Sequence, residues 1–135
     1  MSADYPSMTT AEIRSKFLNF FEERGLKLYP SSSLVPDDPS LLLANAGMNQ
    51  FKEFYQGKKT MKEIGAISCQ KCVRTNDIDC IGEDGRHLSF FEMLGDFSFG
   101  GVSKEQACAW AFELITKEFL SLIHISEPTR LLSIS

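Results

Sequence analysis

Two candidate strands joined by a polar loop occupy residues 65–94, and this pattern constrains the fold more than any other part of the chain. From residue 65 to residue 74 the side chains fall into two sets at a spacing of two, as in a β-strand. One set contains Ile67, Cys69, Lys71 and Val73, and the other contains Ala66, Ser68, Gln70, Cys72 and Arg74. Residues 75–85 are polar, and 88–94 form a second apolar, aromatic strand candidate. Two such strands can pair antiparallel across the loop, which commits the chain to a sheet that other elements must cover.

A helix is predicted to begin after Thr9, because Thr9 and Glu12 form a capping box in which each side chain can bond the other's backbone N–H. Apolar residues then recur at helical spacing up to Gly25, which tolerates a left-handed C-terminal cap. The stripe consists of Ile13, Phe17, Phe20, Phe21 and Arg24. We interpret it as part of a buried core rather than as a cofactor-binding surface.

The middle of the chain predicts two strands and a short helix. Residues 26–29 are extended in character before Pro30, and residues 40–44 form an apolar run of strand length that we expect to be buried. A short helix is expected at residues 48–55, where Met, Phe and Tyr recur before a glycine. Residues 56–62 are polar and basic, which is typical of an exposed connector.

The last predicted elements are a turn and a helix. Residues 95–101 are expected to form a glycine-flanked aromatic turn, and residues 103–106 form a second capping box. The helix that follows is expected to run to about Phe119. Its predicted buried face contains Ala107, Trp110, Ala111 and Leu114. Together these elements predict an α+β fold, an antiparallel sheet flanked by helices.

Composition excludes some classes of function. The 135 residues are 43% hydrophobic and 24% charged, with a formal charge of −4 and an isoelectric point near 5.2. This balance argues against a protein that holds nucleic acid mainly through a basic surface. No apolar run of about 18 residues is present to cross a bilayer, and residues 1–8 lack the layout of a secretory signal. We therefore expect a cytoplasmic protein with no membrane partner.

Four cysteines, at positions 69, 72, 80 and 108, raise the possibility of a metal site. Cys69 and Cys72 have the C-x-x-C spacing that can begin a zinc site, but no second ligand pair follows at a compatible spacing. Positions three apart in a strand also face opposite sides of the sheet. We expect reduced, partly buried thiols and no metal ligand in this chain, with a zinc-binding module as the less favoured alternative.

The chemistry is predicted to lie where the two candidate strands meet the loop. Arg74 ends the first strand, and Arg86 and His87 begin the second, so strand pairing brings these side chains together. Two guanidinium groups beside one cleft repel each other unless an anion lies between them, and the planar guanidinium suits phosphate. Phe90 and Phe91 follow, and either ring can offer a flat face to a base. The pattern predicts a nucleotide site, and the alternative is a pair of surface arginines neutralised by Asp77, Asp79 or Glu83.

This layout resembles motif 2 of the class II aminoacyl-tRNA synthetases, which consists of an Arg, a variable loop, and then Arg or His followed by x-x-x-Phe. Both 86–90 and 87–91 satisfy that ending. Five strings, in order, resemble the alanyl-tRNA synthetase family more closely. They are AEIR at 11–14, SSSLVP at 31–36, NAGMNQFK at 45–52, CVR at 72–74 and FFEMLGDFSFG at 90–100. The resemblance covers residues 9–119, and the combination is specific although each string alone is weak.

The resemblance implies an alanine–tRNA ligase. Such an enzyme uses ATP to convert alanine to alanyl-adenylate and then passes the alanyl group to tRNA(Ala). ATP, alanine and tRNA(Ala) are therefore the implied partners, and Mg²⁺ is the implied metal on the phosphates. Zinc of the full-length family is expected outside this chain.

By motif position, Arg74 is implied to hold the α-phosphate of ATP and the alanine carboxylate, as a catalytic residue together with Arg86. Either Arg86 or His87 is implied to meet the γ-phosphate, although His87 has the alternative of only orienting a neighbour. One of Phe90 and Phe91 is implied to stack on adenine. These roles come from the family pattern rather than from spacing alone.

Three further positions complete the implied ATP site. Asn76 and Asp77 are implied to contact the base or the tRNA acceptor end, and Met93 is included with a core position as its alternative. The loop departs from the family in lacking a lysine between Arg74 and Arg86, so a loop-lysine role is absent or supplied elsewhere. The proline of motif 1 can be either of two, Pro30 or Pro36.

The C-terminal segment breaks the family pattern. Residues 120–130 match a translation of a transposase adaptor used to prepare sequencing libraries, and Pro128 opposes helix continuation there. We expect a disordered N-terminus at 1–8, the N-terminal part of a class II synthetase catalytic domain with motifs 1 and 2 at 9–119, and a non-native tail at 120–135. Lacking motif 3, the chain is expected to be inactive alone. The alternative function is a non-catalytic nucleotide- or RNA-binding module.

Overall fold

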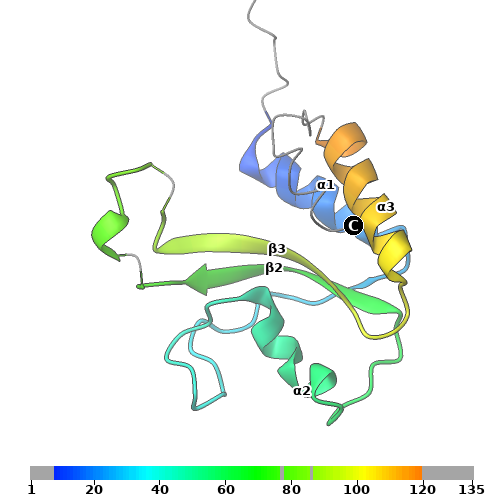
Figure 1. Cartoon of the computed structure of the whole chain (residues 1–135), viewed down its shortest axis with the longest axis horizontal. Coiled ribbons are helices and arrows are strands. Elements are labelled where there is room, and N and C mark those ends of the chain that lie inside the picture. Colours follow the sequence, from blue (N-terminus) through cyan, green and yellow to red (C-terminus); the bar gives the residue numbers. More distant parts are fainter. Residues whose placement is uncertain (1–7, 77, 86, 120–135) are drawn as a thin grey trace, which may run out of the picture.

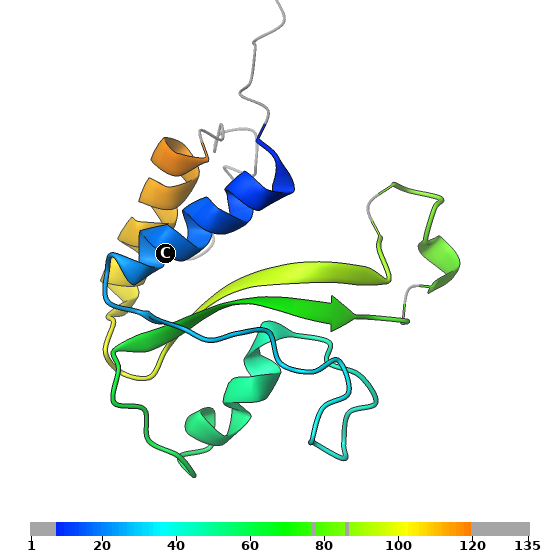
Figure 2. The same ribbon diagram turned by 180° about the vertical axis from the view of Figure 1, so that it is seen from behind.

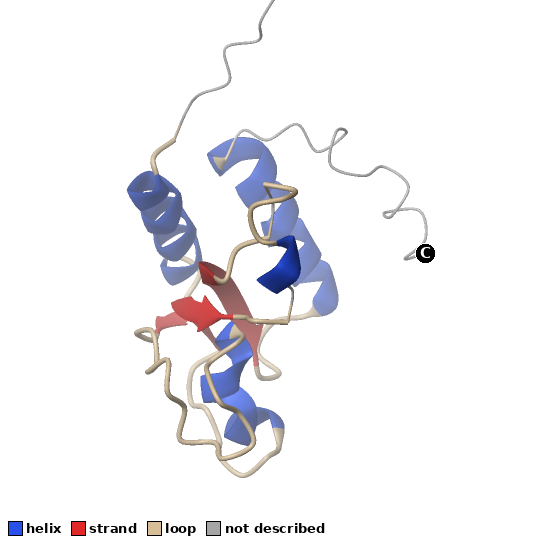
Figure 3. Ribbon diagram, turned by 90° about the vertical axis from the view of Figure 1, so that its left-hand side faces the viewer, coloured by secondary structure: helices blue, strands red, loops and turns tan. Residues whose placement is uncertain are grey.

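A three-stranded sheet lies between two groups of helices in this computed structural model, which describes residues 8–76, 78–85 and 87–119. The strands are β1 (Lys27–Leu28), β2 (Gly65–Val73) and β3 (Phe90–Ser98), in the order β1-β2-β3. Helices α1 (Thr10–Glu22) and α3 (Lys104–Glu113) lie on one side of the β2–β3 hairpin, and η1 (Gly47–Phe51) with α2 (Lys52–Tyr55) lies on the other (Figures 1 and 2). The side view in Figure 3 shows these three layers. The α+β prediction is confirmed, but the sheet is mixed, because β1 runs parallel to β2.

The predicted antiparallel hairpin is confirmed, with Val73 opposite Phe90 at one end and Gly65 opposite Ser98 at the other. The second strand, however, begins at Phe90 and continues to Ser98, so the prediction of a turn across residues 95–101 was wrong. The chain instead bends at residues 99–102.

Gly95 explains why this glycine-containing segment stays extended. A Cβ at Gly95 would lie 2.7 Å from Cζ of Phe97, so the absence of a side chain leaves room for the Phe97 ring against its own strand. That ring then packs on Phe51 with 4.7 Å between ring centroids. The glycine therefore serves side-chain packing within a strand rather than a turn.

Helix α1 begins as its sequence predicts. The Thr9 hydroxyl accepts from the Glu12 backbone N–H, and the Glu12 carboxylate accepts from the Thr9 backbone N–H, which completes the capping box. The aromatic stripe is core, since Phe17, Phe20 and Phe21 are buried and form edge-to-face contacts. The helix is followed by Gly25 with a φ of +88°, as predicted for a left-handed cap.

Helix α3 continues through a π-helical turn, η3 (Leu114–Glu118), to the predicted end near Phe119. The Ser103 hydroxyl accepts from the backbone N–H of Gln106 and caps its N-terminus. Leu114 is buried in the same core cluster as the α1 aromatics, and Trp110 packs against that cluster. Ala111 is exposed, so the predicted buried face was too wide at that position.

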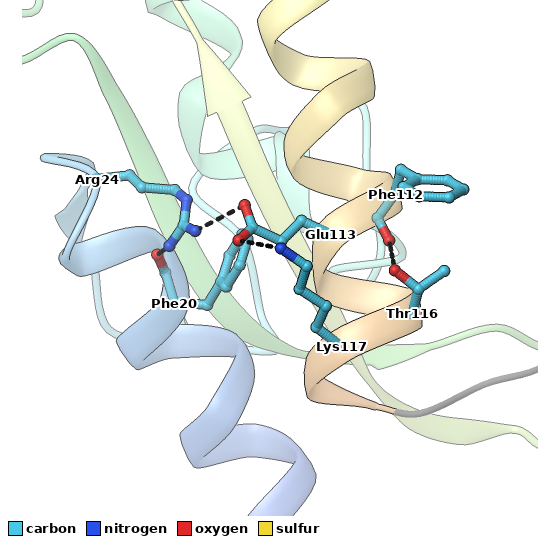
Figure 4. A network of polar contacts seen from close by, with 6 residues as sticks. All are labelled: Phe20, Arg24, Phe112, Glu113, Thr116 and Lys117. Atoms are coloured by element: carbon cyan, nitrogen blue, oxygen red, sulfur yellow. Dashed lines mark hydrogen bonds and ion pairs between the residues drawn. The ribbon is translucent and has the colours of Figure 1, made fainter.

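A polar network ties the end of α1 to α3 (Figure 4). The guanidinium of Arg24 donates to Glu113 at 2.9 Å and to the carbonyl of Phe20 at 2.7 Å. Its carbon lies 3.4 Å from the centroid of the Phe20 ring, so the same group also makes a cation–π contact. Lys117 reaches the other oxygen of Glu113 at 3.5 Å. The network therefore links the two helices beside the aromatic core that packs between them.

The prediction of a buried strand at residues 40–44 was wrong, because a side chain turns the backbone just before it. The Asp38 carboxylate accepts from the Ser40 backbone N–H at 2.9 Å and from its hydroxyl at 2.6 Å. Leu42 is 88% exposed. Only Ala44 is buried in this segment; its N–H donates to the carbonyl of Leu34, and its carbonyl accepts a single bond from the N–H of Val73 at the end of β2.

The short helix at residues 48–55 is confirmed, with a 3₁₀ first half and an α-helical second half. Of the three periodic residues only Phe51 is buried, whereas Met48 and Tyr55 are each 49% exposed. Of the predicted connector at residues 56–62, every residue is exposed except Met61, which is half-buried.

Replacing Gly95 with Ala should lower the free energy of unfolding by about 1–3 kcal/mol, because the added methyl group overlaps the Phe97 ring. The same change in a Phe97→Leu background should cost less, since the shorter side chain can move aside. Urea unfolding of the parent, both single variants and the double variant measures this coupling. Equal costs of Gly95→Ala in the two backgrounds would contradict the packing explanation.

Acid should weaken the link between α1 and the hairpin. Arg14 donates to the Glu92 carboxylate at 2.6 and 3.1 Å, and this hydrogen bonding lowers the pKa of Glu92 below 4.5. A carboxyl group whose pKa is lower in the folded state stabilises the fold above its unfolded pKa and loses that contribution as pH falls through the folded value. Glu92→Gln should therefore destabilise the chain near neutral pH and have little effect near pH 2, as measured by urea unfolding. Glu83→Gln, at an exposed position, is the matched control, and a constant effect of Glu92→Gln across this range would refute the prediction.

Candidate nucleotide-binding site

Alternation along the hairpin divides the predicted site residues between two faces. Cys72 pairs with Phe91 and Gln70 pairs with Met93, so these four side chains share one face of the sheet. This is the face that η1 covers, since the Gly47 N–H donates to the Met93 sulfur at 3.2 Å. Helices α1 and α3 cover the opposite face (Figure 2).

Arg74 lies one residue beyond β2, and three contacts orient it. Its backbone N–H donates to the carbonyl of Ser89 at 2.9 Å, which continues the hairpin pairing. Its Nε donates to the carbonyl of Asn45 at 3.0 Å. The guanidinium carbon lies 5.2 Å from the centroid of the Phe91 ring. Within the described ranges, no carboxylate pairs with Arg74, so its two Nη groups remain available to an anion such as phosphate.

Phe90 and Phe91 face opposite sides of the hairpin. Phe91 is half-buried on the face that carries Arg74, whereas Phe90 is paired with Val73, is 51% exposed and shares the face that carries the Arg14–Glu92 ion pair. Only Phe91 therefore combines an aromatic face with the neighbouring cation. The geometry favours Phe91 over Phe90 as the stacking platform, a choice that the motif left open.

Other predicted site residues lie in the loop between the strands. Asn76 and His87 are exposed. The backbone N–H of His87 donates to one oxygen of Asp84 at 3.0 Å, and its Nδ1 lies 2.5 Å from the other, so Asp84 orients the imidazole. Asp77 and Arg86 lie outside the described residues, and their predicted roles stay predictions.

The sequence left two alternatives for Met93, a core position and a position beside the other candidate site residues, and Met93 has both properties. Its side chain is half-buried against η1, as expected of a core position, yet it shares a face with Phe91. Sequence reasoning gave no role to Gln70, which is fully buried on the same face. The signal available in the sequence was the alternation that places Gln70 on the same face of the strand as Arg74. A glutamine buried on that face requires hydrogen-bond partners for its amide.

A separate groove of about 690 Å³ lies between α2 and the loop that follows β1. Its lining mixes acidic side chains such as Asp38 and Glu53 with Lys52, Lys58 and Lys59. Lys52 is ion-paired with Asp38, and Lys59 with Glu53. Arg74 and Phe91 are not among its lining residues, so we do not assign the nucleotide to this groove.

The cysteines do not form a chelating cluster. Cys69 and Cys72 lie on opposite faces of β2, and burial raises the pKa of both thiols. All four cysteines are free; Cys72 is buried and Cys69 half-buried as predicted, but Cys80 and Cys108 are exposed. Among the described residues, no group of three or more His, Cys, Asp or Glu side chains could hold a metal ion. In the same part of the chain, no helix has the length and apolar character needed to cross a membrane.

Known proteins resemble this chain over most of its length. Residues 12–126 match the family described as tRNA synthetases class II (A), and the chain therefore belongs to that family. The curated relatives are named alanine–tRNA ligases. The chain is 52% identical over 119 residues to that of Picosynechococcus sp., covering 88% of this chain and 14% of the relative. It is 56% identical over 107 residues to the chloroplastic/mitochondrial ligase of Sorghum bicolor, covering 79% of this chain and 11% of the relative.

The chain thus spans roughly a tenth to a seventh of the length of these relatives. The ligase of Microcystis aeruginosa gives the same picture, with 54% identity over 112 residues, or 83% of this chain and 13% of that protein. The family is shown by these matches, whereas the reaction of a whole ligase involves much more polypeptide than is present here.

The two phenylalanines should differ in their effect on ATP use. We consider a chimera in which residues 9–119 replace the equivalent segment of the full-length Picosynechococcus ligase. Phe91→Ala should raise the KM for ATP in alanine-dependent ATP–pyrophosphate exchange by about 5- to 100-fold, because base–aromatic stacking contributes about 1–3 kcal/mol. Phe90→Ala, the matched control on the other face, should change it less than about twofold. A larger effect at Phe90 would reverse the assignment.

Proposed function

We propose that this chain is the N-terminal part of the catalytic domain of an alanine–tRNA ligase. The observation that carries the proposal is the placement of Arg74 beside Phe91 on the face away from α1, in a chain that belongs to the class II (A) synthetases. A cation with free donors next to an aromatic ring suits a nucleotide, whose phosphates and base need these two groups. The proposed substrates are ATP, alanine and tRNA(Ala).

In the first proposed step, an oxygen of the alanine carboxylate attacks the α-phosphorus of ATP. A new P–O bond forms, the bond to the β-phosphate oxygen breaks, and pyrophosphate leaves with the electron pair. In the second step, a hydroxyl of the terminal tRNA ribose attacks the alanyl carbonyl and forms the ester bond, the bond between that carbon and the AMP phosphate oxygen breaks, and the hydroxyl proton passes to the departing phosphate or to solvent. Neither step changes an oxidation state, so the requirements are positioning and charge stabilisation.

Arg74 supplies the charge stabilisation that this chain can offer. Because its Nε is held by the Asn45 carbonyl, its two Nη groups can donate to the α-phosphate and the alanine carboxylate, where negative charge lies in the reacting state. Arg86 or His87 is proposed to meet the γ-phosphate, with Asp84 holding the imidazole of His87. Asn76 and Asp77 are proposed to contact the base or the acceptor end, and Met93 to line the site beside Phe91.

Magnesium would neutralise phosphate charge in such a reaction. It would be held mainly by the ATP phosphates, with protein ligands mostly outside this chain, and we assign no step of this chain to it. Among the described residues there is also no group of three or more carboxylate, imidazole or thiol ligands of the kind that a structural zinc site needs. The cytoplasm is our proposed location, and the named relatives include chloroplastic/mitochondrial ligases as well as bacterial ones.

Alanine-dependent ATP–pyrophosphate exchange tests the proposal. The isolated 135-residue chain should show none, because it has only 11–14% of the length of its relatives. The chimera described above should be active, and Arg74→Ala should lower its kcat by about 100- to 1,000-fold, as expected for loss of one donor to a developing anion. Arg74→Lys should recover only part of that loss, since lysine cannot reproduce the planar fork.

Two results would overturn this assignment. An inactive chimera that nevertheless folds and binds ATP would support the non-catalytic nucleotide- or RNA-binding module instead. Exchange that is unaffected by Arg74→Ala would remove Arg74 from the site. Lys71→Ala, at an exposed position on β2, is the control for a general effect of lost positive charge near the hairpin.

A further inference from the structure

The side chain of Gln70 is fully buried, and both ends of its amide are hydrogen-bonded. Its oxygen accepts from the Ser32 N–H at 2.8 Å, from the Ser32 hydroxyl at 3.1 Å and from Nε2 of Gln50 at 3.1 Å. Its nitrogen donates to the carbonyl of Ser32 at 3.1 Å and to that of Lys71 at 2.8 Å. Such a saturated amide is costly to disturb, because each lost partner leaves a polar group without compensation in a dry environment.

These bonds join three segments that are far apart in the sequence. β1 pairs with β2 for only two residues. Beyond β1, the Gln70 side chain replaces backbone pairing by binding both the N–H and the carbonyl of Ser32. Gln50 belongs to η1, which lies over the same face of the hairpin. Gln70 therefore holds η1 and the chain after β1 against β2.

The segment held by Gln70 is also the one that orients Arg74. Its far end carries the Asn45 carbonyl, which accepts from Nε of Arg74. Between these two ends Gly47 is buried, and its N–H donates to the Met93 sulfur. The segment is thus held to the sheet at three places, by Gln50 on Gln70, by Gly47 on Met93, and by the Ala44 carbonyl, which accepts from the N–H of Val73 at 2.9 Å.

We propose that Gln70 is a positioning residue for Arg74. Through Gln50 it fixes residues 45–50 on the sheet, so that the Asn45 carbonyl holds the Arg74 guanidinium beside Phe91 and leaves both Nη groups for an anionic ligand. The placement of the Arg74 guanidinium by Gln70 is a claim about the structure of the chain alone. The effect of Gln70 on adenylate formation rests, in addition, on the proposed function.

Hydrogen exchange at the Arg74 side chain tests the geometric claim in the 135-residue chain. The Nε–H of Arg74 should give a resolved ¹H–¹⁵N NMR signal with slowed exchange. Gln50→Ala removes the bonds from η1 to Gln70 and to the carbonyl of Pro30 but leaves the bonds between Gln70 and Ser32, so the fold should be kept. It should accelerate exchange of the Arg74 Nε–H by about threefold to tenfold, the range expected for one weakened hydrogen bond.

Two further variants complete this comparison. Gln56→Ala, at an exposed position after α2, is the matched control and should leave the exchange rate unchanged. Gln70→Leu should accelerate exchange at least as much as Gln50→Ala, and if it does not fold, Gln50→Ala alone decides. Unchanged exchange in Gln50→Ala overturns the proposal. So does the absence of a protected Arg74 signal in the unsubstituted chain.

Kinetics of the chimera test the consequence for the reaction. Gln50→Ala should lower kcat for ATP–pyrophosphate exchange by about 10- to 100-fold, the scale of a small misplacement of a reacting group, while the KM for ATP changes far less. Titration of active sites separates this from a merely structural effect, which would lower the number of active sites at an unchanged kcat per site. That structural outcome overturns the positioning role. An inactive unsubstituted chimera would count against the proposed function alone, because the exchange of the Arg74 proton still decides the geometry.

Discussion

Strand β2 contacts α1, β1, β3 and η1, and the rest of the described fold depends on it because it is covered on both faces and bonded along both edges. Its first four residues are buried without exception, and further along both Gln70 and Cys72 have no exposed surface. Ile67 enters the aromatic core under α1 on one face, while Gln70 holds η1 on the other. A strand constrained in all four directions cannot shift its register by one residue without exchanging its two faces. The side chain one residue beyond its end, Arg74, therefore follows a strand whose register is fixed by packing on both faces.

Sequence patterns correctly predicted the elements that are determined by residues close together in the chain. The Thr9 capping box, the α1 aromatic stripe and the paired hairpin are each set by residues close in sequence, or by a simple spacing of two or 3.6. Two of the wrong predictions have causes that spacing does not contain. Residues 40–44 are apolar enough for a strand, but the Asp38 side chain captures the Ser40 amide and turns the chain. Residues 95–101 look like a turn, but Gly95 is present to accommodate the Phe97 ring.

The candidate site likewise has features that the sequence predicted and features that depend on contacts between distant residues. Alternation alone places Arg74 and Phe91 on one face once the hairpin register is known, and the sequence correctly brought the two strand ends together. It did not predict that the Asn45 carbonyl would orient the guanidinium, because that contact spans 29 positions in the chain. Nor did it assign Gln70, since a glutamine in a strand is usually an exposed polar residue and only tertiary structure shows it to be buried.

The outer edge of β3 has consequences for how this chain behaves by itself. Within the described residues β3 is the last strand of the sheet, so its backbone pairs with β2 on one side only. Nine extended residues on that side present a row of amide donors and carbonyl acceptors, next to side chains as apolar as Phe90. Such a row is a potential template for pairing with another extended chain. Within a longer chain, this edge of β3 can pair with a further strand and extend the sheet. Between separate copies of this chain, the same edge can cause self-association.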